Sequence, residues 1–258
     1  MNPINKKERN DLRIFYMQMR KDKATQEEEL AGFARMMDLT KEQFLVWNVF
    51  EQPFFDVGQI NACDALIAGG SSDDPEKATI LDPNEYPWIA NAKKLVRHCF
   101  EQSVPTFVSC MGFLVSLEAL EGRIILDKEH MEEGYYPTHL TDAARRDPLF
   151  RGLPPSFMVI SFHKKRADGL PPGCVLLAYS DLCPVHAFQG VGKPFYAFQF
   201  HPELDRTDLI SKLERYITRY FDDEKSKNVL QHIIDTCPET PESNKLARNF
   251  IDFVVLGK

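Results

Sequence analysis

Thr106-Phe107-Val108-Ser109-Cys110-Met111-Gly112 is the stretch from which the fold and chemistry of this chain can be inferred. Residues 105–109 are apolar and predict a buried strand, and residues 112–120 predict the helix that follows. A strand that runs straight into a helix makes a strained turn, which projects Cys110 above the sheet. Backbone N–H groups at a helix start favour a thiolate and can stabilise an oxyanion. The stretch therefore predicts a cysteine nucleophile.

A second stretch, Phe198-Gln199-Phe200-His201-Pro202-Glu203, offers an imidazole and a carboxylate at the end of another apolar strand. A cysteine needs a nearby base to become a thiolate at neutral pH, and the base needs an orienting partner. Active sites of open α/β sheets lie at the carboxyl ends of the strands. We therefore predict a catalytic triad of Cys110, His201 and Glu203. The alternatives are a buried core cysteine, a structural histidine and a surface carboxylate.

Alternating strands and helices on both sides of Cys110 predict a parallel sheet with right-handed crossovers. The expected strands are 12–19, 44–50, 65–68 and 105–109, and the expected helices are 26–37, 88–102 and 112–120. The first of these helices is expected to carry Glu27, Glu28 and Glu29 in its first turn. Short strand-like runs then follow, at 123–125, 135–140, 157–162, 175–179, 185–188 and 195–200. Pro-rich and Gly-rich turns between these runs indicate antiparallel additions to the same sheet. Polar helices are expected at 207–220, 226–236 and 241–255.

The composition sets limits on domain organisation and partners. The 258 residues fit an N-terminal tail (1–11), one α/β domain (12–205) and a C-terminal helical extension packed on it (206–258). A net charge of −7 argues against nucleic acid or an anionic membrane as the partner. The six cysteines are scattered without a CxxC pair, so no metal site and no disulfide framework are predicted. The start is no signal peptide and no apolar run could span a bilayer, so we expect a cytoplasmic protein.

Other polar features have weaker signals. Gly69 and Gly70 follow an apolar run, and the Gly70 N–H is expected to act as an oxyanion donor beside that of Met111; a plain turn is the alternative. Three histidines are expected to be structural: His139, His163 and His186. The basic run 164–166 is expected to be a solvated loop, with binding of an acidic partner as the alternative.

These motifs resemble the class I (triad-type) glutamine amidotransferases, most closely free-standing proteins related to the glutaminase domain of GMP synthase. The resemblance covers residues 12–205. The matching segments are Gly69-Gly70-Ser71, Cys110-Met111-Gly112, Glu133-Gly134-Tyr135-Tyr136-Pro137, Asp147-Pro148-Leu149-Phe150, Leu170-Pro171-Pro172-Gly173, Gln189 and Phe198-Gln199-Phe200-His201-Pro202-Glu203.

The resemblance implies a flavodoxin-like, mainly parallel mixed sheet with helices on both faces, followed by C-terminal helices. It also implies attack of the Cys110 thiolate on the side-chain amide of glutamine, a γ-glutamyl thioester, release of ammonia and hydrolysis to glutamate. No metal or organic cofactor is expected. The sequence has no phosphate-binding loop, so a partner protein is expected to use any ammonia produced.

One departure from the family pattern leaves other functions open. After Cys-x-Gly the family usually carries His or Met and then Gln, and that Gln helps to hold the substrate; here the two positions are Phe113 and Leu114. An apolar leucine cannot donate those hydrogen bonds. One alternative is therefore a γ-glutamyl peptidase or hydrolase that acts on a larger, less polar substrate. The other is a non-catalytic regulatory or binding protein that keeps the fold.

Overall fold

Strand β4 (Thr106–Ser109), which carries the predicted nucleophile at its end, lies inside a wide sheet in the computed structural model. The structure describes residues 7–71, 83–84, 86–220 and 224–258. Within them the strands form a nine-stranded and a two-stranded sheet. In spatial order the larger sheet contains β2 (Phe44–Asn48), β1 (Ile14–Met19), β3 (Ala65–Ser71), β4, β11 (Phe195–Phe198), β10 (Ala187–Gly190), β9 (Cys174–Tyr179), β6 (Glu132–Leu140) and β7 (Ser156–His163).

The direction of the strands divides the larger sheet into two parts. Neighbours from β2 to β11 are parallel, whereas β11, β10, β9, β6 and β7 pair antiparallel. The expected parallel half and its antiparallel additions are therefore confirmed. The carboxyl ends of β3, β4 and β11 meet at one edge, and this brings Gly70, Cys110 and His201 into one region.

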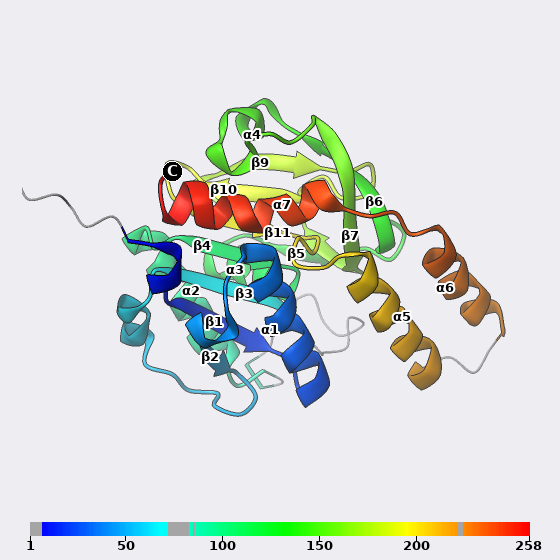
Figure 1. Ribbon diagram of the computed structural model, residues 1–258, viewed down its shortest axis with the longest axis horizontal. Coiled ribbons are helices and arrows are strands. Elements are labelled where there is room, and N and C mark those ends of the chain that lie inside the picture. Colours follow the sequence, from blue (N-terminus) through cyan, green and yellow to red (C-terminus); the bar gives the residue numbers. More distant parts are fainter. Residues whose placement is uncertain (1–6, 72–82, 85, 221–223) are drawn as a thin grey trace, which may run out of the picture.

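Helices cover both faces of the sheet (Figure 1). The helices are α1 (Lys23–Met37), α2 (Ile89–Gln102), α3 (Met111–Ala119), α4 (Asp142–Arg146), α5 (Arg206–Tyr220), α6 (Glu224–Thr236) and α7 (Pro241–Asn249). Side chains of β1 alternate between the two faces: Ile14 and Tyr16 pack with α1 and α7, whereas Phe15 and Met17 pack with α2 and α3. Two apolar cores on opposite faces explain why β1 is buried along its whole length.

Helix α3 is apolar nearly all round, because it is enclosed between the sheet and α2. Gly112 permits its close approach to the sheet, since a Cβ atom there would lie 2.9 Å from the Val108 Cβ and 3.1 Å from the Ala68 Cβ. Helix α1 begins earlier than expected, because the Asp22 carboxylate caps it by accepting the Thr25 N–H at 3.0 Å. Its three glutamates, Glu27 to Glu29, therefore lie beyond the first turn where we expected them.

The described chain after residue 205 is mainly helical, as expected. Helix α7 packs against α1 and crosses it at a large angle (Figure 1), and its Leu246 and Ala247 join the core on that face of the sheet. The chain continues after α7 as a π-helical segment, Phe250–Val255. Residues 1–6 of the expected N-terminal tail lie outside the described residues, and Arg9–Asp11 form a single 3₁₀ turn.

Among the described residues, one short α-helix and one short strand were not predicted. One is α4, which Thr141 caps by accepting the Ala144 N–H. The other is β8 (Lys165–Ala167), which pairs antiparallel with β5 (Ile124–Leu126). The expectation of a solvated basic loop is therefore wrong for two of its residues. Lys165 is buried, and Arg166 forms an ion pair with Asp127, because this segment is the second strand of a small sheet.

No helix in the described part of the chain is long and apolar enough to cross a membrane.

Candidate active site

Cys110 occupies a sharp turn between β4 and α3. Its backbone has φ 51° and ψ −103°, a conformation that is rare for a residue with a side chain. Its N–H donates to the Phe198 carbonyl of β11 at 2.8 Å, which ties the turn to the neighbouring strand. Such strain persists only where the surrounding structure enforces it, and it is common at active sites. The Cys110 Sγ lies 3.9 Å from the Phe162 carbonyl oxygen.

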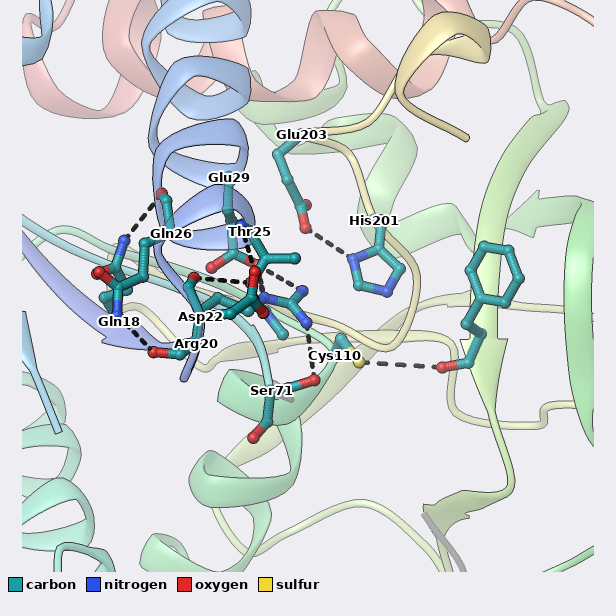
Figure 2. Close-up of polar contacts among 12 residues, drawn as sticks. Gln18, Arg20, Asp22, Thr25, Gln26, Glu29, Ser71, Cys110, His201 and Glu203 are labelled. Atoms are coloured by element: carbon teal, nitrogen blue, oxygen red, sulfur yellow. Dashed lines mark hydrogen bonds and ion pairs between the residues drawn. The ribbon is translucent and has the colours of Figure 1, made fainter. Parts of the chain in front are cut away.

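His201 and Glu203 follow β11 and form a hydrogen-bonded pair. The His201 Nδ1 lies 2.7 Å from the Glu203 Oε1 (Figure 2). The His201 side chain is 4% exposed and the Glu203 side chain is fully buried. The His201 N–H donates to the Ile160 carbonyl at 2.8 Å, which holds this segment against β7. The imidazole is thus oriented by a carboxylate on one nitrogen, while the ring faces the region of Cys110 (Figure 2).

The electrostatics of this pair favour opposite charges. Burial disfavours the imidazolium, but the charges of Glu203 and the Cys110 sulfur outweigh it and raise the pKa of His201 to about 9. Burial likewise disfavours the Glu203 carboxylate, but the charge of His201 outweighs it and lowers the pKa of Glu203. At neutral pH the pair is therefore an imidazolium beside a carboxylate.

This pair gives a testable pH dependence of stability. The folded-state pKa of His201, about 9, lies above its ordinary value of 6.5, so its contribution is complete below pH 6.5 and is lost as the pH rises through 9. We expect wild type to lose up to roughly 3 kcal/mol more unfolding free energy over that window than His201→Gln. Urea unfolding of both proteins from pH 6 to pH 10 measures the difference. Parallel curves would contradict the prediction.

A second buried ion pair lies beside the triad residues, and sequence reasoning missed it. The Glu29 carboxylate is 2% exposed and accepts hydrogen bonds from the Arg20 Nε at 2.9 Å and Nη2 at 2.7 Å (Figure 2). The Tyr16 hydroxyl donates to its other oxygen. The Arg20 Nη1 donates to the Ser71 carbonyl at 2.7 Å, so the pair connects β1, α1 and the end of β3.

This cluster stabilises one charge state of each member. Burial disfavours the Arg20 cation, but the Glu29 charge outweighs this and raises the pKa of Arg20 above its ordinary value. Burial and the Glu29 charge both raise the pKa of Tyr16 well above its ordinary range, so its hydroxyl stays protonated. The available signal was that Arg20 immediately follows the first strand, at the edge where sites of such sheets lie.

Gly70 lies between this ion pair and the triad residues. Its N–H donates to the Glu29 Oε1 at 3.0 Å. A Cβ atom on Gly70 would overlap the Arg20 guanidinium and lie 3.3 Å from the His201 Cε1, so a side chain there would have to displace the guanidinium. A Cβ atom on Gly69 would overlap the Glu29 carboxylate in the same way. The structure thus brings both predicted glycines to the site, but in this arrangement the Gly70 N–H is bonded to Glu29 instead of facing a substrate.

The remaining predicted site residues belong to α3. Met111, 7% exposed, begins this helix directly after Cys110. Phe113 is fully buried and packs on Phe188 with ring centroids 5.3 Å apart, so its side chain belongs to the core; its place in the substrate-binding shell stays a prediction. The helix turns its side chain towards the core beneath β10. Leu114 is also largely buried, at 7% exposure, and belongs to the same core.

Further polar groups lie in the antiparallel half of the sheet. His163, Cys183 and His186 are buried and close enough to share a metal ion. His163 and His186 both approach the Glu132 carboxylate inside the fold, which agrees with the expectation that these histidines are structural.

Comparison with known proteins agrees with this geometry. Residues 46–215 match the family model described as "Glutamine amidotransferase class-I". The chain is 31% identical over 118 residues to a glutamine-hydrolyzing GMP synthase subunit of Thermococcus kodakarensis, an alignment that covers 46% of this chain and 61% of that protein. It is 28% identical over 185 residues to the glutamine-hydrolyzing GMP synthase of Thermosipho melanesiensis, which covers 71% of this chain and 32% of that protein. The matches thus span less than two thirds of the length of these relatives.

Solved structures share the fold. A glutamine amidotransferase from Thermotoga maritima superposes with a TM-score of 0.72 at 16% identity, covering 94% of this chain and 98% of that one. A structure described as a putative GMP synthase subunit from Thermoplasma acidophilum gives a TM-score of 0.62 at 18% identity, covering 93% of both chains. The mixed sheet with helices on both faces and the C-terminal helices are therefore confirmed as an amidotransferase-like fold.

Proposed function

We propose, for a chain that belongs to the class I glutamine amidotransferase family, that Cys110 attacks the side-chain amide of glutamine or of a related γ-glutamyl compound. One observation carries the proposal: a strained cysteine turn lies at the end of β4, beside a buried histidine that a carboxylate orients at 2.7 Å. The protonated imidazole beside the sulfur favours the thiolate, which is the nucleophilic form.

The reaction follows from these groups. The Cys110 thiolate adds to the amide carbon, and the developing oxyanion is stabilised by the N–H of Met111 at the start of α3. His201 then donates its proton to the leaving nitrogen, so that ammonia departs and a γ-glutamyl thioester remains. The neutral imidazole next removes a proton from water, which attacks the thioester and releases glutamate and the free thiol. Glu203 holds the imidazole in the required orientation throughout.

The second oxyanion donor requires a rearrangement near Gly70. Its N–H is bonded to Glu29 in this structure, so it can serve the oxyanion only after the peptide turns away from that carboxylate. The Arg20 guanidinium lies beside Gly70 at this edge. We infer that substrate binding supplies the free energy for this rearrangement.

A larger γ-glutamyl substrate is the second candidate. Leu114 stands where the family usually carries a glutamine that holds the substrate, and its buried side chain cannot form those hydrogen bonds. Turnover of γ-glutamyl dipeptides or anilides without glutaminase activity would select this candidate. If the ammonia that is released serves another reaction, we propose that a partner protein consumes it. One relative named above is a subunit of a GMP synthase, which supports this proposal.

Covalent labelling tests the proposal. A chloroketone analogue of glutamine is expected to add once to wild type, as seen by intact mass, and not to add to Cys110→Ser. Cys63→Ser is the matched control, since Cys63 is also a partly exposed thiol but burial raises its pKa. Labelling that persists in Cys110→Ser would overturn the assignment of the nucleophile. If Cys110 reacts with iodoacetamide but not with the analogue, the γ-glutamyl specificity is wrong.

A further inference from the structure

Four side chains with metal-ligating atoms converge inside the antiparallel half of the sheet. Glu132 begins β6, His163 ends β7, and Cys183 and His186 lie between β9 and β10. His163 is 7% exposed and the other three are fully buried. Only Cys183 and His186 are close in sequence, and the set lacks the paired short spacings of a zinc motif, which is why the sequence predicted no metal site.

The ligating atoms face one small region. The Glu132 Oε2 lies 3.1 Å from the His163 Nε2 and 3.0 Å from the His186 Nε2. The Cys183 Sγ and one ring nitrogen of each histidine all lie within 4.8 Å of one another. Ligands of a tetrahedral zinc ion, at about 2.0–2.3 Å from the metal, are separated by somewhat less than this, so small side-chain rotations would complete the site.

One central atom lacks a hydrogen bond. The His186 Nε2 is buried and has no hydrogen bond of acceptable geometry within the described part of the chain, although the Glu132 oxygen is near. The Cys183 thiol donates to the Val185 carbonyl at 3.4 Å, a bond that it would give up as a thiolate ligand. An unsatisfied buried nitrogen costs free energy, which a bound cation would recover.

Hydroxyl groups that hydrogen-bond to these side chains orient them in the way that outer residues orient the ligands of a metal ion. The Thr138 hydroxyl lies 3.1 Å from the His186 Nδ1, so a proton on that nitrogen leaves the Nε2 lone pair directed at the centre. The Ser180 hydroxyl donates to the Glu132 Oε1 at 2.5 Å and accepts the Cys183 N–H at 2.9 Å. One hydroxyl thus orients two of the four groups.

We propose that Glu132, His163, Cys183 and His186 bind a structural Zn²⁺ ion. Two imidazole nitrogens, a thiolate and a carboxylate are ligands that zinc accepts in a closed four-coordinate site. On binding, Cys183 releases its proton to solvent, and the two negative ligands balance the charge of the ion. Because His163 directly follows Phe162, whose carbonyl faces the Cys110 Sγ at 3.9 Å, the ion would fix the end of β7 beside the nucleophile.

Metal analysis of the full-length protein tests the proposal independently of activity. After incubation with zinc and dialysis against metal-free buffer, wild type is expected to retain about one zinc ion per chain by mass spectrometry. Cys183→Ser and His186→Gln are each expected to lose most of it. Cys237→Ser is the matched control, because Cys237 is a buried thiol outside this cluster and should leave the zinc content unchanged.

A titration of the metal-free wild-type protein avoids any failure of the variants to fold. Cobalt should give the visible bands of a tetrahedral site with a thiolate charge-transfer band, and zinc should displace it and raise the Tm. Wild type that retains no zinc and binds no cobalt would overturn the proposal and leave a metal-free hydrogen-bonded cluster. Zinc that persists in the Cys183→Ser, His186→Gln double variant would also overturn it.

Discussion

Replacing Cys110 by alanine is expected to abolish turnover of every γ-glutamyl substrate while the fold is retained. Without the sulfur no thioester can form. A water molecule in its place would not be positioned and activated to attack the amide carbon. The loss of a nucleophile commonly lowers kcat by roughly 10⁴–10⁶-fold. Ammonia release from glutamine and hydrolysis of γ-glutamyl anilides, each with circular dichroism of the variant, measure the effect.

The control for this prediction is a buried cysteine outside the site. Cys99 lies on α2, is fully buried, and burial raises its pKa to about 12, so it cannot act as a nucleophile near neutral pH. Cys99→Ala should therefore retain activity at a modest cost in stability. Full activity of Cys110→Ala on any substrate would show that the triad assignment is wrong. An inactive wild type that labels at Cys110 would instead point to a missing partner.

Local signals in the sequence located much of this site. The stretch around Cys110 has an apolar strand, a small residue and an apolar helix in immediate succession, and these features depend on neighbours in the chain. The segment with His201 and Glu203 is similarly local, so its position after β11 could be predicted. The parallel order of the strands followed from their alternation with helices.

Features formed by distant segments could not be predicted in this way. The hydrogen bond between the Gly70 N–H and Glu29 joins β3 to α1, and Glu29 looked like one of three acidic residues in a first turn. The direction of the Phe113 side chain depends on how α3 rotates against the sheet, which an almost uniformly apolar helix does not reveal. The cluster around Glu132 likewise requires the pairing of β6 with β7 and β9.

Arg20→Met and Glu29→Gln are each expected to lower the free energy of unfolding by roughly 3–5 kcal/mol, because each leaves the opposite charge buried without its partner. The double variant should lose less than the sum of the two, since it buries no unpaired charge. Urea unfolding of the four proteins gives the interaction energy. The exposed pair of Lys23 and Glu51 is the matched control, and the corresponding variants should leave the urea midpoint nearly unchanged, because water screens both charges.

The same variants are expected to impair the chemistry of the site through Gly70. Glu29 holds Arg20, and Arg20 holds the Ser71 carbonyl, so either change releases the backbone that places Gly70 beside His201. We expect this loss of positioning to outweigh any gain from freeing the Gly70 N–H from Glu29. Displacing reacting groups by about 1 Å can lower the rate about 10²-fold. We therefore expect the labelling of Cys110 by the chloroketone analogue of glutamine to slow by roughly 10–100-fold. Labelling is measured well below the urea midpoint of each variant, so that only folded protein is compared. If labelling is unchanged in the destabilised variants, the ion pair stabilises the fold but does not position Gly70.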